Sequence, residues 1–127
     1  MTVQSAIERA DEMRAGNSAP EEMKIRWLSE LDGVIYNDVI LTHEVEAEPY
    51  TGYKDDVTKK LIAEEPYDVL YVYWLMAQID LKASELNKYN NSLALFKDAL
   101  KDYKAWFNRT HMPKKKAKIK LCIDGGR

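Results

Sequence analysis

Apolar residues recur at intervals of three and four in four separate stretches, the spacing of helices that bury one face. The predicted helices cover residues 3–14, 20–42, 67–88 and 91–109. Thr2 or Ser5 is a candidate cap for the first helix, and Ser18, followed by a proline and a glutamate, predicts the start of the second. Asp32 lies off the apolar stripe of that helix, and Gly33 lies in the interior of the helix. A glycine inside a helix costs about 1 kcal/mol relative to alanine. Either another backbone approaches Gly33 and requires a glycine, or the helix tolerates this cost, and we favour the second interpretation. The pattern predicts an all-α fold.

The third predicted helix is apolar on all sides in its first half. One stripe runs from Val69 to Ile79, and Tyr71, Trp74 and Leu75 lie off it. A helix that is apolar all round must be buried all round, and three neighbouring helices are few for that task. Aromatic side chains are frequent anchors of protein interfaces. The pattern therefore makes Tyr71, Trp74 and Leu75 candidate subunit contacts, with a plain core role as the alternative.

A long acidic loop separates the second and third predicted helices. Residues 44–66 contain seven acidic residues and three lysines, a net charge of -4, and show no periodicity. Loops longer than about 12–15 residues are uncommon in compact domains and tend to be functional or ordered by a partner. Asp55 and Asp56 are therefore candidate contacts with another subunit or a partner. Paired acids can also serve acid–base catalysis, but in a loop we interpret them as solvated charge.

The C-terminal residues 114–127 form a basic tail after a helical domain of residues 1–113. Residues 112–127 hold six basic residues and one acidic residue, so they carry +5, and the rest carries -7 of the total of -2. Residues 117–123 alternate between apolar and mostly basic types, which predicts a strand. A single strand must pair with the long loop, pair with a neighbouring chain, or remain disordered. The candidate contacts of the tail are Lys114, Lys115, Lys116, Lys118 and Lys120, which could instead contact a phosphate backbone.

The residue types that carry chemistry are sparse. Cys122 is the single cysteine, which excludes an intramolecular disulfide and a cysteine-based zinc site. The histidines, His43 and His111, are far apart in sequence, so we expect solvated residues and no metal site. No glycine-rich loop leads from a strand into a helix, and no apolar run is long enough to cross a bilayer. We expect a soluble cytoplasmic protein that is not an enzyme and binds no cofactor.

Four segments of the chain carry a family resemblance. They are EMKIRWLSELDGVIY at residues 22–36, PYDVLY at 66–71, NKYNNSLALF at 87–96 and YKAW at 103–106. Over about residues 3–113 the chain resembles small head–tail connector (adaptor, head-completion) proteins of tailed phages and prophages. The basic tail lies outside this resemblance.

The resemblance implies an all-α structural protein of the virion without enzymatic activity. Its partners would be itself, in a ring of about a dozen copies, the portal protein, and the next connector or tail protein. DNA would pass through the ring without specific recognition, and no membrane would be involved. The protein would lie at the head–tail junction, and in the host cytoplasm during assembly.

Two other classes of function stay open. A small helical module could contact nucleic acid or a protein partner through its basic tail, in which case binding to random duplex DNA would be sensitive to salt. A small hydrolase or metal enzyme would need a cleft holding a perturbed histidine or carboxylate, for which the sequence gives no signal.

Overall fold

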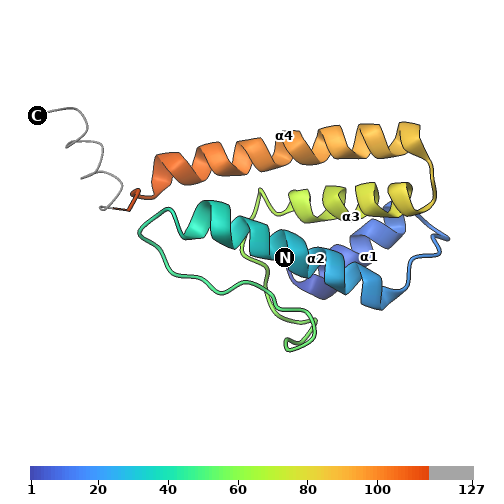
Figure 1. The fold of residues 1–127 in the computed structure, drawn as a ribbon, viewed down its shortest axis with the longest axis horizontal. Coiled ribbons are helices and arrows are strands. Elements are labelled where there is room, and N and C mark those ends of the chain that lie inside the picture. Colours follow the sequence, from blue (N-terminus) through green and yellow to red (C-terminus); the bar gives the residue numbers. More distant parts are fainter. Residues whose placement is uncertain (115–127) are drawn as a thin grey trace, which may run out of the picture.

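The computed structural model describes residues 1–114 and is helical, without a strand in that range. Figure 1 shows the order of its elements, which are α1 (Val3–Met13), α2 (Glu21–Ile35), η1 (Tyr36–Ile40), α3 (Val69–Lys82) and α4 (Leu86–Thr110). The segment η1 continues α2 as one wider π-helical turn. The prediction of an all-α fold with four helices is confirmed. The predicted strand in the tail lies outside the described residues.

The helix α3 occupies the centre of the fold. The antiparallel helix α4 covers one side of it, and α1 and α2 cover the other (Figure 1). Leu70, Tyr71, Leu75 and Ala77 of α3 are completely buried. The central position explains why the sequence of this helix is apolar on all sides, since each side meets a neighbour.

The long loop, residues 41–68, closes the part of α3 that the three helices leave open. Its residues Tyr50, Leu61 and Ala63 belong to the same buried core. The interpretation of Tyr71 and Leu75 as subunit contacts is therefore wrong, because both side chains are enclosed by their own chain. Trp74 remains partly exposed, and its indole N–H donates to the carbonyl oxygen of Trp27 at 3.0 Å.

The boundary between the third and fourth helices differs from the prediction. The pattern predicts that the third helix ends at residue 88 and that the fourth begins at residue 91, but residues 86–91 lie inside α4, and residues 83–85 form the connection. Ser84 adopts the left-handed conformation, with φ 59°, that glycine would usually mark. Ser92 lies inside α4, where its hydroxyl donates to Asp80 at 2.7 Å. The asparagines at positions 87, 90 and 91 face solvent, where a helix tolerates them.

The helix starts agree with the prediction in part. The Thr2 side chain caps α1 by accepting from the Ser5 amide at 3.1 Å, as expected. Ser18 does not cap the second helix, which begins at Glu21 after Pro20 without a side-chain cap. A Cβ added at Gly33 would meet nothing within 4 Å, so no other backbone approaches there. This confirms the interpretation that the helix tolerates the cost of a glycine at this position.

Candidate interaction surface

A buried aspartate of α2 anchors both ends of the loop segment 50–63. The Asp32 side chain is fully buried and accepts hydrogen bonds from the Tyr50 amide at 2.7 Å and the Ile62 amide at 3.2 Å. Its third donor is the Tyr71 hydroxyl at 2.7 Å, which in turn accepts from the Ala63 amide at 2.7 Å. One carboxylate thereby joins α2, α3 and two distant points of the loop.

Asp32 is shielded from solvent but is surrounded by hydrogen-bond donors. Burial raises the pKa of Asp32 above its usual value, although the hydrogen bonds from Tyr50, Tyr71 and Ile62 and the charge of Lys59 oppose this shift. Burial raises the pKa of the Tyr71 phenol, and the nearby charge of Asp32 adds to the effect. Neither group faces an open cleft, so the arrangement is a structural clamp on the loop.

The first residues of the loop are attached to the end of α4. The His43 ring is buried, with Nδ1 2.7 Å from the Val39 carbonyl oxygen and Nε2 2.8 Å from Oδ1 of Asn108. It also packs edge-on against Phe107. The expectation of a solvated His43 is wrong, because these contacts give each ring nitrogen a partner inside the fold.

Beside this attachment, the chain after α4 pairs with the start of the loop. The Glu44 amide donates to the Met112 carbonyl oxygen at 2.8 Å, and the Lys114 amide donates to that of Thr42 at 3.1 Å. His43 and Pro113 form an antiparallel bridge between these two bonds. The pairing fixes the direction of the chain where the described residues end.

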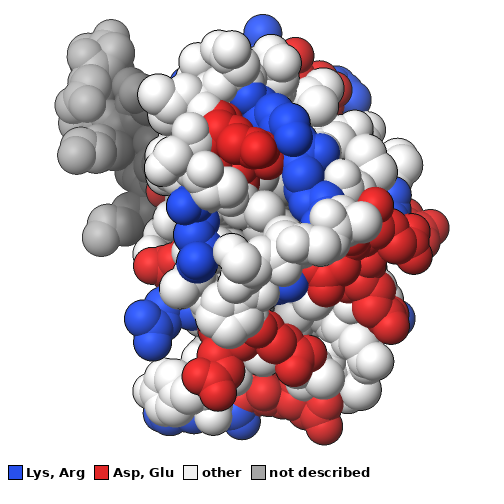
Figure 2. Space-filling model, turned by 90° about the vertical axis from the view of Figure 1, so that its right-hand side faces the viewer, with Lys and Arg blue, Asp and Glu red and all other residues white. Residues whose placement is uncertain are grey.

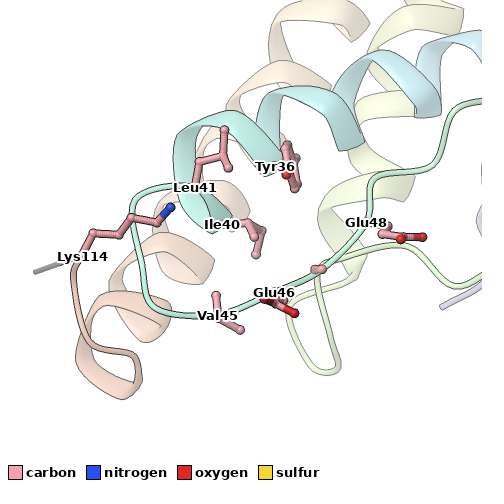
Figure 3. A pocket seen from close by; sticks show the side chains of 8 residues that line it. Tyr36, Ile40, Leu41, Val45, Glu46, Glu48 and Lys114 are labelled. Atoms are coloured by element: carbon pink, nitrogen blue, oxygen red, sulfur yellow. The ribbon is translucent and has the colours of Figure 1, made fainter. Parts of the chain in front are cut away.

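An open groove of about 550 Å³ lies between η1 and the loop (Figure 3). Its apolar lining consists of Tyr36, Ile40, Leu41, Val45 and Ala47, and its charged lining consists of Glu46, Glu48 and Lys114. The π-helical turn forms one wall, and such turns are frequent at functional sites. The groove therefore combines an apolar floor with an acidic rim, and a lysine stands at one end.

Both ends of the elongated domain expose large apolar side chains. At the end where α3 meets α4, Met13, Leu81 and Leu86 are exposed, Leu86 by 61%. At the opposite end, beside the groove, Leu41 and Met112 are exposed, Met112 by 56%. The 25 residues of α4 separate the two ends by about 37 Å, at about 1.5 Å per residue.

The charged surface of the described residues is mixed in sign. Figure 2 views the molecule from the end at which α3 meets α4. Acidic and basic side chains both lie on this face, and neither sign covers it continuously. Nucleic-acid binding usually requires a clustered basic surface. This face therefore does not resemble a nucleic-acid interface.

The two acidic candidate contacts, Asp55 and Asp56, form hydrogen bonds within the loop itself. The Asp55 carboxylate accepts from the amide and the hydroxyl of Thr51, at 2.8 and 2.9 Å, and from Lys59 at 3.3 Å. The amide and hydroxyl bonds from Thr51 lower the pKa of Asp55, and Lys59 adds to this. Asp56 accepts from the Thr58 amide at 2.9 Å. The structure does not bring these two aspartates to the groove.

Among the basic candidates, the structure places only Lys114, which is exposed at the groove. Lys115, Lys116, Lys118 and Lys120 lie outside the described residues.

The sequence pattern predicted neither the groove nor the role of Asp32. The strict alternation of acidic and apolar residues over 44–48 was a usable signal for the groove. Nothing local distinguishes Asp32 from the other polar residues of its helix.

A further polar tie joins three helices at the far end of the domain. The Arg14 guanidinium donates to both carboxylate oxygens of Asp80, at 2.7 and 3.0 Å, and to the Ser92 hydroxyl at 3.1 Å. Burial acts to raise the pKa of Asp80, but the hydrogen bonds from Arg14 and Ser92 outweigh it, so the pKa lies below its usual value. These hydrogen bonds hold α1 against the α3–α4 pair, and the side chains of Arg14, Asp80 and Ser92 are all paired with one another.

Within residues 1–114, no group of three or more histidine, cysteine, aspartate or glutamate side chains is arranged to hold a metal ion. Among the helices described, none is both long enough and apolar enough to cross a membrane. Comparison of the chain with protein-family models, curated proteins and solved structures finds no match.

Proposed function

We propose that the chain is a structural subunit of a ring at the head–tail junction of a tailed phage or prophage, where it bridges the portal to the next connector or tail component. The resemblance of residues 3–113 to head–tail connector proteins supports this proposal. The all-α domain agrees with that resemblance, although an all-α fold alone fits many functions.

The observation that carries the proposal is the presence of exposed apolar side chains at both ends of the domain. A bridging subunit must contact two different partners, and exposed apolar side chains at its two ends are suited to such contacts. Leu81 and Leu86 occupy one end, and Leu41 and Met112 occupy the other. If the long axis of the domain follows the ring axis, one end meets the portal and the other meets the next component.

Assembly measurements with the full chain test this proposal. The purified protein is analysed by native mass spectrometry and sedimentation, alone and with the portal protein encoded in the same genome. We expect a ring of many copies on the portal, visible by electron microscopy. A chain that stays monomeric under both conditions contradicts the proposal. Salt-sensitive binding to random duplex DNA without assembly also contradicts it and favours the binding-module alternative.

Three matched variants test the role of the two ends. Leu86→Asp and Leu41→Asp each place a charge at one end, and Leu95→Asp places the same charge at an exposed position of α4 away from both ends. All three positions are exposed, so the fold is expected to survive. Only one end of the domain would meet the portal, so we expect either Leu86→Asp or Leu41→Asp to weaken portal binding. The Leu95→Asp variant should leave portal binding unchanged. Equal effects of all three variants would contradict the assignment of the ends.

A further inference from the structure

One stretch of the loop has the properties of an open strand edge. Over residues 44–48 the three glutamates are exposed, whereas Val45 and Ala47 are half-buried. Among the described residues, no hydrogen-bond partner is found for the backbone N–H or C=O groups of Glu46, Ala47 and Glu48. Unpaired backbone groups in an extended segment can accept an added strand. This stretch forms one wall of the groove (Figure 3).

The tail of the chain has the complementary pattern. Residues 118–123 read Lys-Ile-Lys-Leu-Cys-Ile, with basic and apolar types alternating where the loop alternates acidic and apolar types. In paired strands, side chains of opposite residues lie on the same face. Pairing the two segments would place apolar side chains together over the floor of the groove. Lys118 and Lys120 would then lie beside Glu46 and Glu48.

We infer that the groove between η1 and residues 44–48 binds residues 118–123 of a second copy of this chain as an added strand. The inference rests on the proposed function, because it names the contact that joins neighbouring copies in the ring. Main-chain hydrogen bonds would supply affinity, and the alternating pockets and charges would set the register.

The direction of the chain at Lys114 favours a second copy over the chain's own tail. Residues 112–114 run antiparallel to residues 42–44, so at Lys114 the chain heads away from residues 45–48. To enter its own groove, the tail would have to reverse direction immediately. Residues 115–117 can connect Lys114 to the bound segment over about 13 Å, at about 3.4 Å per residue. The exchange therefore needs copies whose groove ends lie side by side, as they do around one rim of a ring.

Charge reversal and charge exchange test the pairing in the full chain. Glu46→Lys combined with Glu48→Lys should weaken association between copies about tenfold or more, because like charges then face each other. Adding Lys118→Glu and Lys120→Glu to that variant should restore association. The control, Glu8→Lys with Glu12→Lys, makes the same change in net charge at exposed positions of α1. Association is measured by sedimentation in solution and by the number of copies bound to the portal ring.

Pairs of introduced cysteines distinguish exchange between copies from folding back within one copy. Cys122 is the only cysteine of the sequence, and in the proposed pairing it does not lie opposite Glu46. Lys118 or Lys120 lies there, depending on the direction of the added strand. With Cys122→Ser in place, Glu46→Cys is combined with Lys118→Cys in one variant and with Lys120→Cys in another. One of the two should form a disulfide between copies under oxidising conditions, seen as a covalently linked dimer or larger species on a non-reducing gel. Lys97→Cys, at an exposed position on α4, is the control. A disulfide within one copy, or no disulfide in either variant, overturns the inference.

The outcomes separate this inference from the proposed function. If rings form on the portal, the Glu46 and Glu48 charge variants associate normally and neither cysteine-pair variant links two copies, only the inference fails. If copies become linked in solution but the portal binds none of them, only the ring at the head–tail junction fails. If the wild-type chain associates neither in solution nor on the portal, both fail.

Discussion

The substitution Asp32→Ala tests the clamp that holds the long loop on the helices. It removes the acceptor of three donors, the Tyr50 and Ile62 amides and the Tyr71 hydroxyl. The Tyr50 and Tyr71 side chains are also buried, so the freed donors near them gain little access to water. The loop is then expected to loosen at both of the points where α2 holds it.

The structure sets the magnitude of this effect. A hydrogen bond to a charged group contributes about 1.5–3 kcal/mol, and a buried donor without a partner costs about 1–3 kcal/mol. The three bonds share one carboxylate, whose removal also recovers the cost of burying a charge, so their energies do not add. We expect the free energy of unfolding to fall by about 3–5 kcal/mol, a large part of the about 5–15 kcal/mol typical of a domain.

Denaturant unfolding followed by circular dichroism measures the loss, and amide hydrogen exchange locates it. The Tyr50 and Ile62 amides should lose protection first. The control Asp38→Ala removes an exposed carboxylate from η1 and should change stability by less than about 0.5 kcal/mol. A loss below about 1 kcal/mol with unchanged protection at Tyr50 would refute the clamp.

The pH dependence of the clamp gives a second readout. Because burial raises the pKa of Asp32, the folded chain keeps this proton at a pH at which the unfolded chain has lost it. The contribution of this proton to stability is therefore complete below the ordinary aspartate pKa of 3.8 and is lost as pH rises through the folded pKa. Asp32→Asn should lack this decline. An identical pH dependence in the wild type and the Asn variant would contradict the shift.

Two further substitutions probe other parts of the fold. Gly33→Ala should raise the free energy of unfolding by about 0.5–1 kcal/mol, because the added methyl group meets no neighbour and alanine favours the helix; a lower thermal midpoint would contradict this. Asp80→Asn should cost about 2 kcal/mol at neutral pH by weakening the tie to Arg14 and Ser92. The pKa of Asp80 is lowered, so this cost should shrink as pH falls through the folded pKa, and a cost that grows on acidification in denaturant titrations would count against it.

Much of the fold follows from local pattern. Apolar periodicity located all four helices, because each buries a face against the others and that face repeats with the helical period. The same pattern misplaced the turn before α4. The turn residue is Ser84, which carries no glycine or proline signal, whereas the asparagine-rich stretch that suggests a break is tolerated on an exposed helix face.

The candidate surface was predictable only in its charges. The acidic loop and the basic tail are visible in the sequence, and so is the alternation of residues 44–48. The groove itself depends on how η1 and the loop approach each other, and that approach depends on Asp32 and His43, two polar residues whose burial no local rule signals. Tyr71 and Leu75 illustrate the same limit, because an apolar residue looks alike whether a neighbouring loop or a neighbouring subunit covers it.

By itself, then, the sequence determined the helical class, the approximate helix positions and the division of charge between body and tail, since these depend on neighbours along the chain. Only the tertiary structure decided what covers α3, where the loop is anchored, and that an apolar groove with an acidic rim lies beside the start of the tail. These features depend on contacts between residues far apart in sequence, such as Asp32 with Tyr50 and Ile62. Such contacts leave no period in the chain.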